Sequence, residues 1–292
     1  MTTNMKHHQQ LRSLLFVPAT RPERFDKALA SGAHAVIIDL EDAVAPTDKD
    51  SARTAVAAWL QSRPPAATVP APAPAPALML RINAADTAWF TRDLALVADA
   101  RLAAIMLPKA DSAGTITALR SAGARAVLPL IESLAGLDAL DEIAQAPGVL
   151  RLAFGSIDIQ VDLGLRDALE DELLPLRLAI LMASRRAGLA APLDGVTTAI
   201  DDEARLAVDV ARARRLGYGG KLCIHPKQVA PVNRLFAPSE AEVVWARRIV
   251  EAIHNSGGAA VAVDGKMVDK PVLLRAQAIL AEAGQASPTG RD

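Results

Sequence analysis

Carboxylates follow several apolar runs in this 292-residue chain, and their positions predict a site for a hard cation. Apolar runs of this length are typical of buried strands. A buried strand has no use for an acid at its tip unless something positive lies there. Three runs show the pattern and are followed by acids: residues 35–40 by Glu41 and Asp42, residues 126–131 by Glu132, and residues 149–155 by a short loop holding Asp158.

Glu132 and Asp158 are the candidate metal ligands. Two carboxylates from adjacent strands can hold Mg²⁺ octahedrally and leave positions for water and substrate. No cluster of histidines or cysteines accompanies them, which disfavours Zn²⁺. We expect Mg²⁺, with Mn²⁺ as the alternative. The competing interpretation is that each acid caps the helix that follows it, and position alone does not separate the two.

Two basic residues also follow strand-like segments. Arg81 stands at the end of residues 78–83, where it could bind a substrate carboxylate or a developing enolate oxygen. The alternative is a structural ion pair with Glu41 or Asp42, and both can hold because a guanidinium has several donors. Lys109 follows residues 103–107, and we expect it to act on substrate through its charge rather than as a Schiff base.

The remaining candidates are expected to support the site. Arg12 flanks the first apolar run and could bind the phosphates of a ligand, or could simply be a solvated residue. His225 could be a general base, but a supporting structural role is preferred. The acids of the second run are expected to orient waters, Arg81 or Lys109: Asp39, Glu41 and Asp42.

Strand-like and helix-like segments alternate along the chain, which indicates a parallel sheet. Eight such units in this length predict an α/β fold of the (β/α)₈ TIM-barrel type, with a doubly wound open sheet as the rival. The expected strands are residues 14–18, 35–40, 78–83, 103–107, 126–131, 149–154, 195–199 and 221–224. The expected helices are residues 21–31, 48–61, 87–100, 112–122, 134–146, 172–187 and 201–216.

Three segments do not belong to this alternation. Residues 1–10 are polar and read as a disordered tail ahead of a barrel over residues 11–236. Residues 63–77 are a Pro/Ala-rich insertion, expected to be extended and remote from the active site. Residues 237–292 form a C-terminal helical extension that barrel closure does not need, so it must have another task.

Composition excludes several classes of protein. The chain has 32 basic and 33 acidic residues, a balance that argues against a nucleic-acid partner bound through a broad basic surface. The single cysteine excludes a disulfide framework and fits a reducing compartment. No apolar run is long enough to cross a bilayer, and the start lacks an apolar signal segment. We therefore expect a cytoplasmic protein without a membrane partner.

An ordered set of motifs resembles the citrate lyase β-subunit-like (CitE-like) branch of the HpcH/HpaI aldolase superfamily. Each motif is weak alone, but together they run in family order over nearly the whole chain. They are Leu14–Pro18 with Arg21–Phe25, Ile38–Val44, Arg81–Asn83, Leu107–Lys109, Pro129–Glu132, Phe154 and Gly155 with Asp158 and Asp162–Gly164, Gly220 and Lys221 with Ile224–Pro226, and Gly265–Asp269. One departure is Ala19, where the family often has glycine after the proline.

This resemblance implies a Mg²⁺-dependent carbon–carbon lyase of the oxo-acid class that assembles as a homotrimer or hexamer. Its substrate would be a 3-hydroxy-3-carboxyacyl-CoA of the citramalyl, malyl or citryl type, cleaved reversibly to a 2-keto acid and acetyl-CoA. By analogy, Glu132 and Asp158 match the metal ligands, and Arg81 and Glu132 match the substrate contacts. Asp269 matches a catalytic acid that the C-terminal extension delivers into a neighbouring subunit's site.

Two other classes of function remain open at this point. One is a CoA-independent class II aldolase acting on pyruvate-derived hydroxy acids. The other is a non-catalytic CoA-binding module, or a subunit of a citrate lyase complex that uses an acyl-carrier protein.

Overall fold

The computed structural model describes residues 11–64 and 75–284. The chain divides into two compact units, residues 1–233 and 234–292, and each is described by itself below. The predicted N-terminal tail and most of the Pro/Ala-rich insertion lie outside the described residues.

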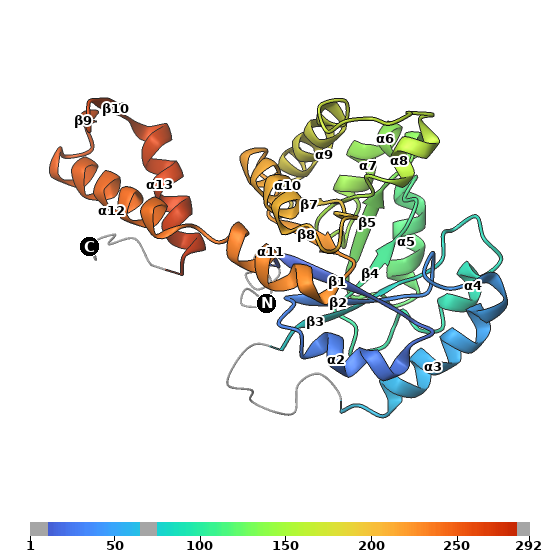
Figure 1. Ribbon diagram of the computed structural model, residues 1–292. Coiled ribbons are helices and arrows are strands. Elements are labelled where there is room, and N and C mark those ends of the chain that lie inside the picture. The colour runs from blue at the N-terminus through green and yellow to red at the C-terminus, as the bar shows by residue number, and fades with distance from the viewer. Residues whose placement is uncertain (1–10, 65–74, 285–292) are drawn as a thin grey trace. The chain divides into compact units, whose positions relative to one another are not determined.

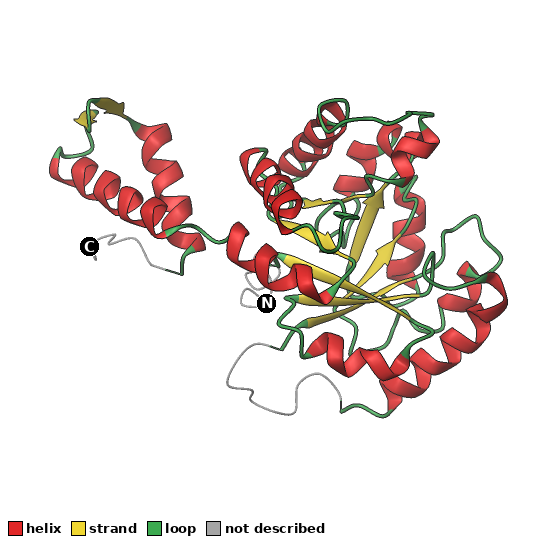
Figure 2. Cartoon of the chain, in the orientation of Figure 1, coloured by secondary structure: helices red, strands yellow, loops and turns green. Residues whose placement is uncertain are grey.

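The first unit is a closed barrel of eight parallel strands (Figures 1 and 2). Each strand pairs with the next, and β8 pairs with β1, so the sheet has no open edge. The predicted TIM barrel is therefore confirmed, and closure excludes the open sheet. The strands are β1 (Ser13–Pro18), β2 (Ala35–Asp39), β3 (Ala77–Arg81), β4 (Ala104–Leu107), β5 (Val127–Ile131), β6 (Ala153–Phe154), β7 (Leu193–Asp194) and β8 (Gly220–Cys223).

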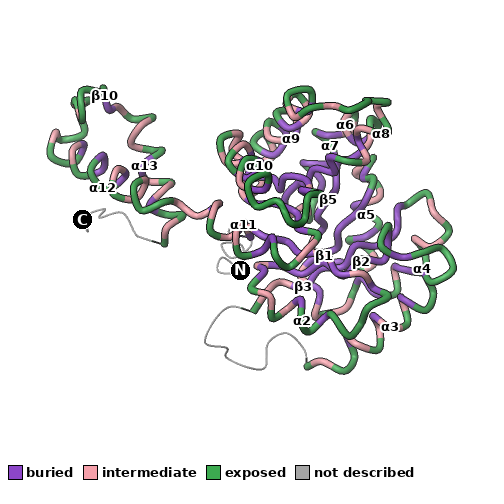
Figure 3. The backbone as a smooth tube through the Cα atoms, in the orientation of Figure 1, coloured by how far each residue is buried: buried purple, intermediate pink, exposed green. Residues whose placement is uncertain are grey.

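Alternating strand residues fill the inside of the barrel, while the others face the surrounding helices. The inner cluster includes Leu14, Ile37, Met79, Met106 and Leu128, all at most 3% exposed. Both faces of the strands are thus covered, and this explains why their sequences read as unbroken apolar runs (Figure 3). The barrel helices are α2 (Phe25–Leu29), α3 (Lys49–Gln61), α4 (Phe90–Asp93), α5 (Ala113–Ser121), α6 (Leu134–Asp138), α7 (Leu140–Gln145), α8 (Asp158–Asp162), α9 (Leu174–Arg186) and α10 (Glu203–Arg215).

The helix predicted over residues 87–100 is wrong, since only α4 forms there and turns follow it. The cause is Asp93, whose carboxylate is fully buried. It accepts hydrogen bonds from the backbone and side-chain amides of Asn83, at 2.8 and 2.7 Å, and from Arg53 Nε at 2.8 Å. These tertiary contacts hold the segment against the end of β3 and outweigh its local helix propensity.

The strand predicted over residues 195–199 is displaced toward the N-terminus. The observed β7 ends at Asp194, and Gly195 then passes so close to the neighbouring loop that a Cβ there would lie 2.2 Å from Ser156 Oγ. A glycine inside a strand-like pattern often marks such an approach of backbone to another segment.

The second unit has its own small core between two helices. It contains α12 (Glu240–Asn255), the hairpin of β9 (Val261–Val263) and β10 (Lys266–Val268), and α13 (Lys270–Glu282). Buried residues of both helices, among them Ile249, Ile253 and Leu280, pack with Val268. The helix α11 (Val229–Phe236) spans the division between the units. Within the described residues, none of the helices has the length and apolar content needed to traverse a bilayer.

Candidate active site

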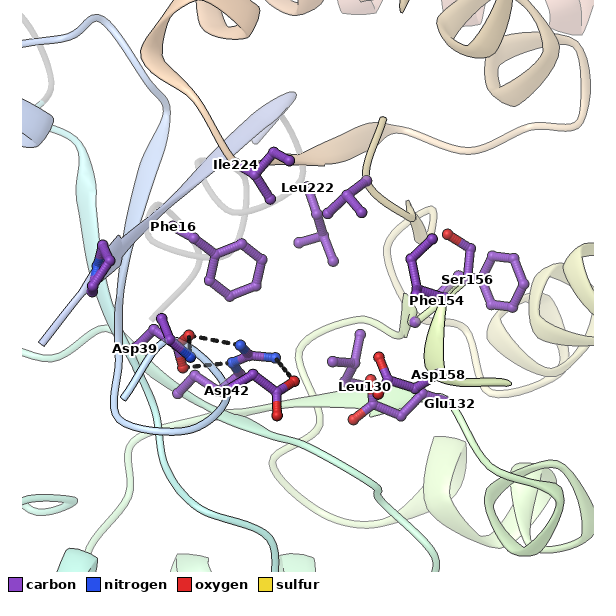
Figure 4. A pocket seen from close by; sticks show the side chains of 16 residues that line it. Phe16, Asp39, Asp42, Leu130, Glu132, Phe154, Ser156, Asp158, Leu222 and Ile224 are labelled. Atoms are coloured by element: carbon purple, nitrogen blue, oxygen red, sulfur yellow. Dashed lines mark hydrogen bonds and ion pairs between the residues drawn. The ribbon is translucent and has the colours of Figure 1, made fainter. Parts of the chain in front are cut away.

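A pocket of about 400 Å³ opens at the carboxyl ends of the barrel strands. Active sites of TIM barrels lie at this end, because side chains that follow several strands meet there. Its wall combines acids and one arginine with apolar side chains (Figure 4). The charged residues in its lining are Asp39, Asp42, Arg81, Glu132 and Asp158.

Arg81 is held by two carboxylates from the β2 end. Its Nε and Nη2 donate to the two oxygens of Asp39, each at 2.7 Å, in the bidentate geometry that carboxylate and guanidinium prefer. Its Nη1 lies 2.8 Å from Glu41 Oε2 and 3.7 Å from Asp42 Oδ2. These acids raise the pKa of Arg81 further above its usual value, although burial alone would lower it. The expected ion pair with Glu41 is present, and Asp39 is a second partner.

Asp39 also shapes the loop that carries Glu41. Its two oxygens accept the backbone N–H groups of Glu41, at 2.9 Å, and of Ala43, at 3.2 Å. The buried Lys49 ammonium donates to the carbonyls of Leu40 and Glu41, both at 2.8 Å. The loop is therefore fixed from both sides, and the orientation of Arg81 is settled before any ligand arrives.

Glu132 is the most perturbed acid of the pocket. Burial raises its pKa to about 8, and the nearby charges of Glu41 and Asp158 act in the same direction. The backbone N–H of Lys109 donates to its Oε1 at 2.8 Å and partly offsets this effect. A deprotonated Glu132 is thus short of positive charge, which a divalent cation would supply.

The capping interpretation of the two predicted ligands does not hold. The helix after Glu132 is capped by Ser133, whose side chain accepts the N–H of Gly136. At α8 the cap position is Ile157, with no side-chain cap bond, and Asp158 already lies inside the helix. Both carboxylates instead line the pocket.

The donor set of Glu132 and Asp158 fits a hard divalent ion. Among residues 11–64 and 75–284, no three His, Cys, Asp or Glu side chains are grouped so as to enclose a metal. A two-carboxylate site is nevertheless what Mg²⁺ commonly uses, because it keeps several waters or substrate oxygens as ligands. All-oxygen donors again disfavour Zn²⁺.

Lys109 and Arg12 do not line the pocket, although the charge of Lys109 still lowers the pKa of Glu41. Lys109 is exposed, does not line the pocket, and contacts Glu132 through its backbone rather than its ammonium. Arg12 lies before the start of β1, at the opposite end of the strand from the pocket, where its carbonyl accepts the N–H of Lys221. The structure does not bring its side chain to this site.

His225 follows β8 but serves as a local cap. Its Nδ1 accepts the backbone N–H of Lys227 at 3.2 Å, and its own N–H donates to Gln228. Neither contact involves the pocket acids, in keeping with the preferred structural role.

Asp269 belongs to the second unit and begins α13. Its carboxylate accepts the N–H of Val272 at 3.4 Å, as an N-cap does. Its proposed role in a neighbouring site stays a prediction.

Two functional contributors were missed by sequence reasoning. Gly155 passes against Glu132 so closely that a Cβ would lie 2.3 Å from Glu132 Cβ. Phe16 places its ring 4.8 Å from the guanidinium of Arg81. Both residues lie in motifs that carry the family resemblance, but sequence reasoning assigned neither of them a role in the site.

Known proteins resemble this chain over most of its length. The model of the HpcH/HpaI aldolase/citrate lyase family matches residues 12–226. A citrate lyase subunit beta-like protein of Mycobacterium tuberculosis is 37% identical over 281 residues, covering 94% of this chain and 96% of that protein. A (3S)-malyl-CoA thioesterase of Cereibacter sphaeroides is 32% identical, covering 93% and 94%.

A crystal structure of CitE from Mycobacterium tuberculosis, in complex with magnesium, acetoacetate and coenzyme A, superposes with a TM-score of 0.82 at 35% identity. The match covers 95% of this chain and 100% of that one. The chain therefore belongs to the HpcH/HpaI aldolase/citrate lyase family.

Proposed function

We propose that this protein is a Mg²⁺-dependent lyase that cleaves a 3-hydroxy-3-carboxyacyl-CoA reversibly to a 2-keto acid and acetyl-CoA. The observation that carries the proposal is the buried Glu132, with Asp158 and the clamped Arg81 in one pocket at the barrel mouth. Magnesium and coenzyme A in the related CitE structure support both the metal and the thioester.

Glu132 and Asp158 would hold the metal, which supplies Lewis-acid stabilisation of negative charge on a substrate oxygen. Arg81 retains two N–H groups beyond the three contacts to Asp39 and Glu41, because a guanidinium carries five. Arg81 lines the pocket, and in the proposed mechanism these two donors bind the oxygen on which enolate charge develops.

The proposed reaction is a retro-aldol cleavage. The proton of the 3-hydroxyl leaves to solvent, its oxygen becomes the keto oxygen, and the bond between C2 and C3 breaks. The electron pair of that bond forms the thioester enolate, and a proton added at C2 then gives acetyl-CoA. We assign that last proton to Asp269 of a neighbouring copy, so the active enzyme would be a homo-oligomer, a trimer or hexamer.

The test is a panel of citramalyl-, malyl- and citryl-CoA with Mg²⁺, in which keto acid and free thiol are measured separately. Stoichiometric keto acid without thiol supports the lyase. Thiol release alone would indicate a thioesterase, the activity named for the Cereibacter relative. Cleavage of free hydroxy keto acids without CoA would indicate the class II aldolase. Turnover only of substrates attached to an acyl-carrier protein would indicate a citrate lyase subunit.

A methyl group at position 155 is expected to damage metal binding. In Gly155→Ala the new Cβ would meet both the Cβ and Oε2 of Glu132, at 2.3 and 2.4 Å, and must displace that carboxylate. We expect Mg²⁺ affinity to fall by about 10- to 100-fold, the range seen when ligand orientation is disturbed. Titration of activity with Mg²⁺ measures it. Gly114→Ala, where the nearest atom is 3.9 Å away, is the control, and equal Mg²⁺ dependence of the two variants would contradict the prediction.

The stability of the metal-free protein should fall as pH rises from about 4.5 to about 8. Burial raises the pKa of Glu132 to about 8 and that of Glu41 to about 7, from a usual 4.5. In this window the folded protein keeps protons that the unfolded chain has lost, so raising the pH favours unfolding. Melting temperatures in EDTA across this range test the slope.

Added Mg²⁺ should raise the melting temperature more at the alkaline end, because its ligands must be deprotonated. In EDTA, the melting temperature of Glu132→Gln should depend less on pH than that of the unmodified protein. A melting temperature independent of pH in the unmodified, metal-free protein would refute the argument.

A further inference from the structure

The pocket has two chemically different sides. In Figure 4, Asp39, Asp42, Glu132 and Asp158 lie along one side, and Phe16, Leu222 and Ile224 lie across from them. Val196 and Phe154 add to the apolar lining. A substrate that fills this cavity must present polar groups to one side and an apolar group to the other.

Positive charge in the lining is confined to one residue. Of the described side chains around the pocket, Arg81 alone is cationic. Two carboxylates already contact it within 2.8 Å, so most of its charge is balanced inside the protein.

Neither nearby lysine can take its place. The Lys49 ammonium is buried behind the loop and donates to the carbonyls of Leu40 and Glu41. Lys109 is exposed and outside the lining.

Resting on the proposed lyase function, we infer that the pocket selects substrates whose C3 carries a small apolar substituent beside its hydroxyl and carboxylate. The keto acid released is then a monocarboxylate such as pyruvate, and a keto dicarboxylate such as oxaloacetate is rejected. The hydroxyl and carboxylate of C3 are accommodated by the metal site, and the free donors of Arg81 are engaged with the thioester oxygen. The third substituent on C3 then meets the apolar side chains of Phe16, Leu222 and Ile224 or the acidic side chain of Asp42.

Physical chemistry then ranks the three thioesters. A methyl substituent buries apolar surface against the apolar side, whereas hydrogen leaves that space unfilled. A carboxymethyl group brings a second carboxylate among acids and apolar groups without a cation to pair it. Desolvation by the apolar groups and repulsion by the acids are both unfavourable. Citramalyl-CoA should be the best substrate, malyl-CoA intermediate and citryl-CoA the poorest.

The test uses the full chain with Mg²⁺ and measures kcat/KM for each thioester. We expect malyl-CoA to be about tenfold below citramalyl-CoA, and citryl-CoA at least about 100-fold below it. A kcat/KM for citryl-CoA within about tenfold of that for citramalyl-CoA would overturn the inference while leaving the lyase function intact.

A binding measurement separates this inference from the reaction itself. Calorimetry with Mg²⁺ should show pyruvate bound more tightly than oxaloacetate. That preference in a protein that cleaves none of the thioesters would support the pocket and refute the lyase. Equal or tighter binding of oxaloacetate would count against the pocket.

Ile224 offers a gain-of-function variant at the apolar side. It follows β8, lines the pocket and is 38% exposed, so a polar replacement there should be tolerated. Ile224→Lys should narrow the ratio of citramalyl-CoA to citryl-CoA by about tenfold or more, by pairing the second carboxylate. Ile224→Gln is the uncharged control. If the lysine and glutamine variants give the same ratio of citramalyl-CoA to citryl-CoA activity, the assignment of this side is wrong. If either variant fails to fold, the ratio measured in the unmodified protein decides.

Discussion

Replacing Glu132 by glutamine is expected to lower kcat/KM at least about 1,000-fold, because the variant loses an anionic metal ligand worth several kcal/mol of transition-state stabilisation. Glutamine keeps a side-chain oxygen that can accept the N–H of Lys109, so the local structure should persist. Removing a buried charge that burial disfavours should leave the metal-free protein at least as stable at pH 8 as the parent. Steady-state kinetics and melting curves in EDTA measure the two effects.

The control is Glu142→Gln, the same chemical change at an exposed position in the first turn of α7. It should alter neither activity nor Mg²⁺ dependence. Near-normal turnover in Glu132→Gln, or in the parent protein treated with EDTA, would rule out the metal site. A variant that loses activity together with its cooperative melting transition would show that Glu132 is needed for folding instead.

The barrel and the location of its site were predictable because both depend on local pattern. Apolar runs separated by amphipathic segments need a sheet covered on both faces, and this fixes the class of fold. Parallel strands all end at one rim, so Glu132 and Asp158 could be placed together without knowing any distance. Arg81 was placed there on the same basis.

The partners within the site depend on register and closure, which local pattern does not contain. Asp39 and Arg81 are paired positions of β2 and β3, and this register makes their bidentate contact. The sequence named Asp39, Glu41 and Asp42 together as residues that orient waters, Arg81 or Lys109, and did not single out Asp39 as the bidentate partner. Likewise, Lys109 was expected to act through its ammonium, whereas its backbone meets Glu132, at a residue with φ of 45°.

Local propensity also failed where a buried polar group or a close approach overrode it. Asp93 ended a helix early by bonding across to Asn83. Gly195 left β7 short because its backbone passes against Ser156. Both residues lie next to the barrel mouth, where loops converge on the site. Sequences depart most from regular periodicity in such regions.

The organisation of the acids has a mechanistic consequence. Asp39 and Glu41 hold Arg81 in one orientation, while Glu132 remains without a neutralising side chain among its hydrogen-bond partners. A cation entering at Glu132 and Asp158 would therefore add charge where the pocket lacks it. In the proposed lyase reaction the arginine would need no rearrangement to meet a developing enolate, and such preorganisation is the main source of electrostatic catalysis.

Replacing Asp269 by asparagine is expected to lower kcat at least about 100-fold, the usual contribution of a general acid. Asparagine is as good an N-cap as aspartate, so α13 should keep its start at the N–H of Val272. Asp264→Asn changes an exposed acid in the turn of the hairpin that precedes Asp269, and it should leave kcat unchanged. Exchange of deuterium into the methyl group of acetyl-CoA isolates the proton transfer, and unimpaired exchange in Asp269→Asn would remove this residue from the mechanism.

Mixing two inactive variants tests whether the acid acts in a neighbouring subunit. A chain with Glu132→Gln has a defective barrel site but an intact Asp269, and a chain with Asp269→Asn has the reverse. In a mixed oligomer, a site built from the second chain's barrel and the first chain's extension is complete. Random assembly after co-expression should restore about a quarter of the sites, since each of the two required chains is chosen half of the time. If Asp269 served its own barrel, every site would carry one defect, and co-expressed variants would be as inactive as either variant alone.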